Sequence, residues 1–289
     1  MGSVTFLGID GGGSKTTFLL ENDEGRELAR FETGPSNWLS SGPVNARESL
    51  THAIQRLPSL PDIVCGGFAG AGRPEGVEFY RSCLLALLPQ AQVFVETDAF
   101  ITYMGAIGPK PGILLIAGTG SIALARQSDG TMIRAGGWGP VFGDEGGGFW
   151  IGREAIRCAL RARDSGEAAE FVSAIEKALG LSRITDAPGA WKDGSIDVRS
   201  VAALASEVIR RYPSDPAREI VDQAAAHLRS LCDVIAPRAD LPATCQKAIS
   251  GSLGNQTIVK QLIGLEFSPA ANPPARGAIL WARNRLASS

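Results

Sequence analysis

Residues 8–16 read GIDGGGSKT and form a glycine-rich turn between two apolar segments, 4–10 and 16–21. Both segments have the composition of β-strands, and a third such segment at 27–33 follows after a short turn. The pattern predicts a meander of three strands joined by hairpins. It does not fit a βαβ unit, because no helix-length segment separates these strands.

The same order of elements occurs twice along the chain. The first half continues with alternating helical and strand-like segments at 44–57, 63–69, 77–88, 92–96 and 99–107. The second half opens with three more strand-like segments at 112–117, 121–127 and 131–135. Helical stretches follow, with a further strand at 247–250, and the proline- and glycine-containing segment 187–195 is expected to be a loop between helices.

This coarse duplication predicts an α/β fold with two related domains. The boundary is expected at 109–111, where two prolines interrupt the pattern, so that the N-terminal domain covers 1–110 and the C-terminal domain 111–289. The last helix begins after Pro273 and Pro274 and is expected to pack back on the N-terminal domain.

Composition excludes several classes of function. The 289 residues carry 28 Lys and Arg against 30 Asp and Glu, with no dense basic run, so nucleic-acid binding is not expected. The apolar runs are too short to cross a bilayer, and the first residues lack the features of a signal peptide. We therefore expect a cytoplasmic protein that binds a small molecule and no membrane. The five cysteines are scattered, which disfavours a zinc site, an iron–sulfur cluster and a disulfide framework.

The turn at 10–16 has the features of a phosphate-binding loop. Consecutive glycines let backbone N–H groups approach an anion, and Asp10 at the strand end can hold Mg²⁺ directly or through water. The turn is not a Walker A loop, because Ser14 displaces Lys15 by one position and the next element is a strand. A tight hairpin without any ligand is the alternative for this segment alone.

A second glycine-rich turn, AGTGS at 117–121, has the equivalent place between the first two strands of the second half. Two such turns at equivalent places in a duplicated fold are what a phosphate chain held by both domains requires. The pair therefore favours phosphate binding over an ordinary hairpin.

Asp98 lies between the strand at 92–96 and the helix that follows. The simplest interpretation is a carboxylate in the first turn of a helix, where Asp is favoured. The carboxyl ends of strands are, however, where open α/β sheets present ligand-binding groups. Phosphoryl transfer to a hydroxyl also needs a carboxylate that orients the alcohol and accepts its proton, so Asp98 is a candidate base.

The segment 136–150, GGWGPVFGDEGGGFW, is too rich in glycine for a stable helix or strand. Such a segment is expected where a ligand or another backbone comes close. Trp138 offers an apolar face to a sugar ring, and Asp144 or Glu145 can accept hydrogen bonds from sugar hydroxyls. The alternative is that Trp138 and Phe142 are aromatic residues of a core between the domains.

Four motifs occur in the same order as in a known family: GIDGGGSKT at 8–16, TDA at 97–99, GTGS at 118–121 and GWGPVFGDEG at 137–146. The sequence resembles the N-acetylglucosamine kinases, which lie in the BadF/BadG/BcrA/BcrD ATPase group of the actin-like superfamily. The likeness runs from about residue 5 to 155 and beyond that thins to SGSLG at 250–254 and the C-terminal tail.

The resemblance implies a duplicated actin-like (ribonuclease H-like) ATPase fold, with ATP and Mg²⁺ in a cleft between the domains. Asp98 would be the catalytic base toward the C6 hydroxyl of an amino sugar, and Asp10 would hold Mg²⁺. The implied nucleotide contacts are Asp10, Gly12, Gly13, Ser14, Lys15, Thr16, Gly118, Thr119, Gly120, Ser121, Gly251, Ser252 and Gly254. The implied sugar contacts are Asn37, Asp98, Thr119, Gly137, Trp138 and Asp144.

Three functions from different classes remain as hypotheses. An amino-sugar kinase is favoured, acting on N-acetylglucosamine, glucosamine or a muramic-acid relative, and the resemblance makes a homodimer plausible. An activator ATPase coupled to electron transfer is disfavoured, because no C-x-x-C pair is present. A non-catalytic sugar sensor is disfavoured, because Asp10 and Asp98 are both intact.

Overall fold

The computed structural model describes residues 3–287, which fold as two compact units. Unit 1 runs up to Lys110 and also includes the segment from Pro269 onward, and unit 2 is Pro111–Ser268. Each unit contains one mixed β-sheet with helices, so the predicted two-domain α/β fold is confirmed. Among residues 3–287, no helix has the length and apolar character that a bilayer crossing requires.

The sheet of unit 1 has the strand order β3-β2-β1-β4-β5. Its strands are β1 (Thr5–Gly11), β2 (Thr16–Asn22), β3 (Glu27–Thr33), β4 (Ile63–Phe68) and β5 (Gln92–Thr97). The first three pair antiparallel, as the hairpin pattern predicts, and β4 and β5 add to β1 in parallel. The carboxyl ends of β1, β4 and β5 therefore lie at the same edge of the sheet.

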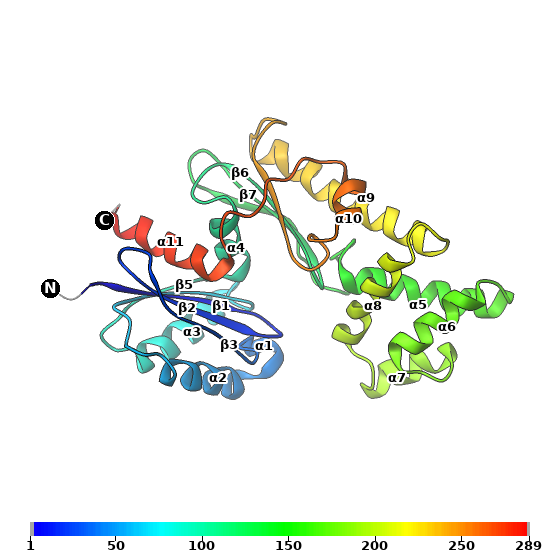
Figure 1. Cartoon of the computed structure of the whole chain (residues 1–289), viewed down its shortest axis with the longest axis horizontal. Helices are drawn as coiled ribbons and strands as arrows, with labels where there is room; N and C mark the ends of the chain where they lie inside the picture. Colours follow the sequence, from blue (N-terminus) through cyan, green and yellow to red (C-terminus); the bar gives the residue numbers. More distant parts are fainter. Residues whose placement is uncertain (1–2, 288–289) are drawn as a thin grey trace. The chain divides into compact units, whose positions relative to one another are not determined.

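The helices of unit 1 are α1 (Trp38–Ser41), α2 (Pro43–Gln55), α3 (Pro74–Leu87), α4 (Asp98–Ala106) and α11 (Pro274–Ala287). Alternate residues of β1 point to opposite faces of the sheet. Leu7 and Ile9 pack in the core with α2 and α3, whereas Phe6 packs with α4 and α11. Figure 1 shows these two helix layers on either side of the sheet.

Helix α11 approaches β1 closely at Gly8, where a Cβ atom would lie 2.0 Å from the carbonyl oxygen of Ala275. It approaches α4 in the same way at Gly277, whose Cβ would lie 2.1 Å from the carbonyl oxygen of Ile101. Glycines at these positions let a helix from the end of the chain complete the core of unit 1.

The sheet of unit 2 has the order β8-β7-β6-β9. Its strands are β6 (Gly112–Ala117), β7 (Ser121–Arg126), β8 (Met132–Gly136) and β9 (Lys247–Ser250). Strands β6 to β8 form the same antiparallel meander as β1 to β3, and β9 pairs in parallel with β6 just as β4 pairs with β1. The topology thus contains the predicted duplication.

The remaining part of unit 2 is helical (Figure 1). Its elements are α5 (Gly148–Ser165), α6 (Ala169–Leu179), the 3₁₀ turn η1 (Ile184–Asp186), α7 (Ala187–Asp193), α8 (Val198–Arg210), α9 (Ala217–Arg238) and α10 (Thr257–Ile263). The expectation of a loop at 187–195 is wrong, because most of this segment is α7. Pro188 lies in its first turn and Gly194 ends it with φ 81°, which are the usual places of these residues in a helix.

Candidate active site

In unit 1, two candidate carboxylates come together at the carboxyl edge of the sheet. Asp10 lies near the end of β1, and Asp98 is the first residue of α4, directly after β5. Strands β1 and β5 run parallel on either side of β4, so both carboxylates lie at this edge. The electrostatic interaction between the two carboxylates shows that they are close enough to influence each other's ionisation.

Burial raises the pKa of Asp10 to about 6, and the neighbouring charge of Asp98 adds to the rise, partly offset by Lys15. Burial also raises the pKa of Asp98, which is partly offset because Asp98 Oδ1 accepts the N–H of Ala99 at 2.9 Å. Two carboxyl groups that share a partly dry environment hold protons more firmly than exposed ones. Raised pKa values of this kind are common at functional sites.

The N-cap of α4 is Thr97 and not Asp98. The Thr97 hydroxyl accepts the N–H of Phe100 at 3.1 Å, which is the ordinary capping contact. The simplest interpretation of Asp98, a carboxylate that caps the helix, therefore does not account for its side chain.

The predicted phosphate loop between β1 and β2 is a tight turn in which the N–H of Gly12 donates to the Lys15 carbonyl at 2.9 Å. Ser14 and Lys15 are exposed, and Lys15 pairs with Glu32. The Thr16 side chain is buried instead, and its hydroxyl donates to the Gly34 carbonyl at 2.9 Å. Thr16 thus ties the loop to the segment after β3.

Asn37 follows β3 and is the N-cap of α1, where its Oδ1 accepts the N–H of Leu39 at 3.0 Å. Its side chain lies beside two backbone segments of the site. A Cβ on Gly13 would be 3.9 Å from Asn37 Nδ2, and a Cβ on Gly70 would be 3.0 Å from Asn37 Oδ1. The structure therefore places Asn37 beside the candidate phosphate loop.

Tyr80 in α3 is a residue of this site that the sequence did not indicate. Its buried hydroxyl lies 2.7 Å from the Ser36 carbonyl and 3.0 Å from the Ala69 carbonyl, and accepts the N–H of Trp38 at 3.1 Å. Burial raises the pKa of Tyr80 to about 12, and the charge of Asp98 contributes to the rise. Tyr80 thus fixes the residues on both sides of Asn37. In the sequence, a tyrosine within the apolar stripe of a helix indicates only that the residue packs in the core.

In unit 2, the second candidate phosphate loop is tied to the start of α5. The carbonyls of Gly118 and Thr119 accept the N–H groups of Gly148 at 2.7 Å and Phe149 at 2.9 Å. A Cβ on Gly147 would lie 2.7 Å from the Gly120 backbone, so glycine is required for this approach. Part of the glycine-rich segment 136–150 therefore allows its backbone to contact the backbone of the loop 118–120.

Ser121 is buried and its hydroxyl donates to the Glu145 carbonyl at 2.7 Å, whereas Thr119 is exposed. The loop 251–254 lies beside this turn, because the N–H groups of Leu253 and Gly254 both donate to the Ala117 carbonyl at 3.0 Å. Gly251 has φ 95° and no room for a Cβ against the same carbonyl, and Ser252 is exposed. The two predicted nucleotide segments of unit 2 are thus adjacent.

The predicted sugar residues of unit 2 follow Gly137. Trp138 is 67% exposed, and the guanidinium of Arg134 lies 4.1 Å from its ring centroid. Phe142 is 87% exposed as well, so neither aromatic side chain belongs to the core of unit 2.

Asp144 connects this segment to the second phosphate loop. It adopts φ 60°, and its Oδ1 accepts the N–H of Gly139 at 3.2 Å. A Cβ on Gly120 would lie 2.3 Å from Asp144 Oδ2, so the carboxylate rests directly on that loop. Burial raises the pKa of Asp144, an effect that the Gly139 N–H partly offsets.

Two curated kinases are similar in sequence to somewhat more than half of this chain. Over 169 residues the chain is 37% identical to an N-acetylmuramic acid/N-acetylglucosamine kinase of Clostridium acetobutylicum, covering 55% of this chain and 54% of that protein. Over 180 residues it is 32% identical to an N-acetyl-D-glucosamine kinase of Dictyostelium discoideum, covering 57% and 56%. The matches thus span about half the length of these curated relatives.

A solved structure from Chromobacterium violaceum, provisionally named an N-acetylglucosamine kinase, has the same fold. It superimposes with a TM-score of 0.77 at 28% identity over 96% of this chain and 98% of that one. The model of the BadF/BadG/BcrA/BcrD ATPase family matches residues 7–262. The chain therefore belongs to the BadF/BadG/BcrA/BcrD ATPase family.

Proposed function

We propose that this protein is an ATP-dependent kinase that phosphorylates an amino sugar, N-acetylglucosamine or glucosamine, at its C6 hydroxyl. The observation that carries the proposal is the pair Asp10 and Asp98 at one sheet edge, with the candidate phosphate loop beside them. The names of the curated relatives, all amino-sugar kinases, support the substrate class.

Asp98 has the properties of a general base for this reaction. As a carboxylate with a raised pKa, it holds a proton more firmly than an ordinary aspartate and accepts one from the sugar hydroxyl more readily. The backbone N–H groups of the glycine-rich loops would bind the phosphate chain of ATP. We propose that Gly12–Thr16 of unit 1 and Gly118–Ser121 of unit 2 each bind phosphate groups of ATP, with 251–254 near the adenosine.

Asp10 fits a magnesium ligand. Mg²⁺ is usually held by one or two carboxylates together with water and phosphate oxygens, so a larger cluster of protein ligands is not needed. The carboxylate of Asp10 is a hard oxygen donor, and a bound cation would relieve the unfavourable burial of its charge. When bound, Mg²⁺ supplies neutralisation of the charge on the phosphate oxygens.

We propose that Asn37 of unit 1 and Trp138 and Asp144 of unit 2 bind the sugar, together with Gly137 and Thr119. The carboxylate of Asp144 and the amide of Asn37 can accept hydrogen bonds from hydroxyls. Trp138 presents an exposed indole to the apolar face of a sugar ring, and Arg134 occupies one side of that indole.

Trp138→Ala should raise the KM for the sugar about tenfold and leave the KM for ATP nearly unchanged. The substitution removes an apolar contact with the sugar, worth roughly 1.4 kcal/mol, and no charge. Steady-state kinetics with each substrate varied in turn measures this difference. Phe142→Ala is the matched control, because it removes another exposed aromatic ring of the same segment, and both KM values should stay the same. An equal rise in both KM values for Trp138→Ala would contradict the sugar assignment.

Tyr80→Phe should raise the KM for the sugar several-fold and lower the free energy of unfolding by about 1–3 kcal/mol, the usual cost of leaving a buried polar group unpaired. The ring stays stacked on Phe68, with centroids 3.9 Å apart, but the backbone around Asn37 loses its hydroxyl anchor. Tyr103→Phe is the control, because it removes another buried hydroxyl, which donates to the Lys110 carbonyl at 2.7 Å. The two variants should lose similar stability, and only Tyr80→Phe should change the sugar KM. If Tyr80→Phe and Tyr103→Phe had the same sugar KM, Tyr80 would serve only in core packing.

The proposed function is tested by measuring ATP consumption with a panel of amino sugars: N-acetylglucosamine, glucosamine, N-acetylmannosamine and N-acetylmuramic acid. Turnover with at least one of them, and a product phosphorylated at C6 by NMR, is the expected result. ATP hydrolysis that no sugar stimulates would contradict it. Such a result would favour the second candidate, an activator ATPase, which the curated relatives do not support. The homodimer and the cytoplasmic location stay predictions.

A further inference from the structure

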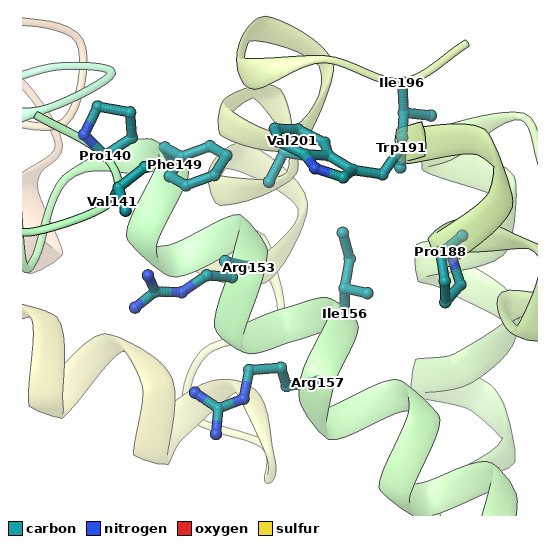
Figure 2. A pocket seen from close by; sticks show the side chains of 11 residues that line it. Pro140, Val141, Phe149, Arg153, Ile156, Arg157, Pro188, Trp191, Ile196 and Val201 are labelled. Carbon is teal, nitrogen blue, oxygen red and sulfur yellow. The ribbon is translucent and has the colours of Figure 1, made fainter. Parts of the chain in front are cut away.

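Unit 2 contains a cavity of about 380 Å³ whose lining includes none of the residues assigned above to the sugar or the nucleotide. Its walls are mainly apolar, and Figure 2 shows the side chains that line it. Phe149 and Ile156 come from α5, Pro188 and Trp191 from α7, and Val201 from α8. A space of this size accommodates a small organic molecule.

Trp191 is a large, partly exposed aromatic residue in the cavity wall. Its ring lies 5.9 Å from that of Phe149 at an angle of 42°, and 47% of the residue is exposed. Two aromatic rings that flank an open, apolar space form a surface that a ligand with an apolar body would cover.

The same cavity carries two positively charged groups. Arg153 and Arg157 lie one helical turn apart on α5, and Figure 2 shows both side chains projecting to the same side of the helix. Both guanidinium groups pair with the single carboxylate of Glu154, at 3.4 Å and 3.1 Å. Two guanidinium groups that share one carboxylate leave positive charge and unused N–H donors at the edge of the cavity.

We propose that this cavity is a binding site for a small amphipathic anion, an apolar ring or branched chain that carries a carboxylate. The apolar walls would bury the ring, and a guanidinium would bind the carboxylate with paired N–H donors. Pro140 and Val141 also line the cavity and belong to the segment between Trp138 and Asp144, so a bound ligand would contact the candidate sugar segment.

A carboxylate of this kind has two sources. It is either a substituent carried by a sugar substrate, such as a lactyl ether, or a separate small molecule. The chemistry of recognition is the same in both cases, and the existence of the site does not depend on the proposed kinase activity.

The test is isothermal titration calorimetry of the full chain with 2-naphthoate as the probe and 2-naphthalenemethanol as its uncharged analogue. The naphthoate should bind at least about tenfold more tightly than the alcohol, the effect of one hydrogen bond to a charged group. Arg153→Gln should remove most of this preference, and it leaves the shorter Arg157–Glu154 pair intact. Trp191→Ala should weaken both ligands.

Glu154→Gln gives the sharpest result, because it removes the carboxylate that competes with the ligand for both guanidinium groups. The naphthoate should bind more tightly to this variant than to the unaltered protein, an outcome that general damage to the fold would not produce. Arg161→Gln is the matched control. Arg161 lies one turn further along α5, does not line the cavity, and should have no effect on the affinity.

Displacement of the bound naphthoate then identifies the source of the carboxylate. Displacement by N-acetylmuramic acid indicates a substituent on a sugar, and displacement by phenylacetate alone indicates a separate small molecule. The proposal is overturned if the naphthoate does not bind, if the alcohol binds equally well, if Arg153→Gln and Glu154→Gln leave the affinity unchanged, or if neither carboxylate displaces the probe.

Discussion

Replacing Asp98 by Asn should lower kcat by about 10² to 10⁴, the usual contribution of a positioned general base. The amide has nearly the size of the carboxyl but neither accepts the proton of the sugar hydroxyl nor carries the charge that orients it. Binding of ATP and sugar should persist, so both KM values should change little. Part of the effect belongs to orientation, because the transition state of phosphoryl transfer is loose and needs little proton transfer.

The stability of the variant distinguishes catalysis from a structural role. Thr97 caps α4, so Asp98→Asn keeps the cap, and burial of the charge already disfavours the ionised Asp98. The melting temperature should therefore stay the same or rise. A kcat within a few-fold of the original, together with a lower melting temperature, would show that Asp98 only supports the helix.

Glu96→Gln is the matched control for this experiment. Glu96 lies two residues before Asp98, is partly buried, and also has a raised pKa because of burial. Its Oε1 accepts the Nε1–H of Trp281 at 3.0 Å. Glu96 is therefore bonded to Trp281, which packs in the layer of α4 and α11 in unit 1. The loss of the Glu96 charge should leave kcat within a few-fold.

Much of the fold was predictable because its signals are local. The strand pattern around 8–16 and its recurrence after Pro111 predict two meanders, and each sheet contains one. The segment 187–195 is mostly helix and not the predicted loop, because Pro188 and Gly194 are compatible with both structures. Proline at the start and glycine just after the end are also helix boundary signals, and only the packing of α7 decides between the two.

The sequence predicts which residue types form the candidate site, but it does not predict the backbone contacts and buried hydrogen bonds that hold them in place. Glycines in 136–150 indicate close approach, but only the structure shows that Gly147 and Gly148 meet the backbone of the neighbouring loop. Thr16 and Ser121 belong to glycine-rich turns predicted to bind a nucleotide, yet their buried hydroxyls donate hydrogen bonds to backbone carbonyls of the protein. Tyr80 acts over long sequence separations, from 80 to 36, 38 and 69, which no local pattern encodes.

Asp10→Asn should increase the free energy of unfolding near pH 8 and abolish most turnover. In the folded protein the pKa of Asp10 is raised from 3.8 to about 6. Below about pH 3 the carboxyl is mostly protonated in both the folded and the unfolded state, so it contributes almost no difference in stability. As the pH rises through about 6, the unfolded state has already released the proton while the folded state holds it, and stability is lost. The whole shift corresponds to about 3 kcal/mol at most.

An asparagine at position 10 does not titrate, so the variant should not show this loss. The expected result is a difference in unfolding free energy between variant and unaltered protein that grows by up to about 3 kcal/mol from pH 3 to pH 8. Urea unfolding with EDTA present, at several pH values, measures it without interference from bound metal. In the Asp98→Asn background the growth should be smaller, because the charge of Asp98 is the second cause of the raised pKa. A variant that is less stable at every pH would instead show that the Asp10 carboxylate supports the fold. Such a residue would be a poor candidate for the magnesium ligand, because functional charges buried at a site generally cost stability.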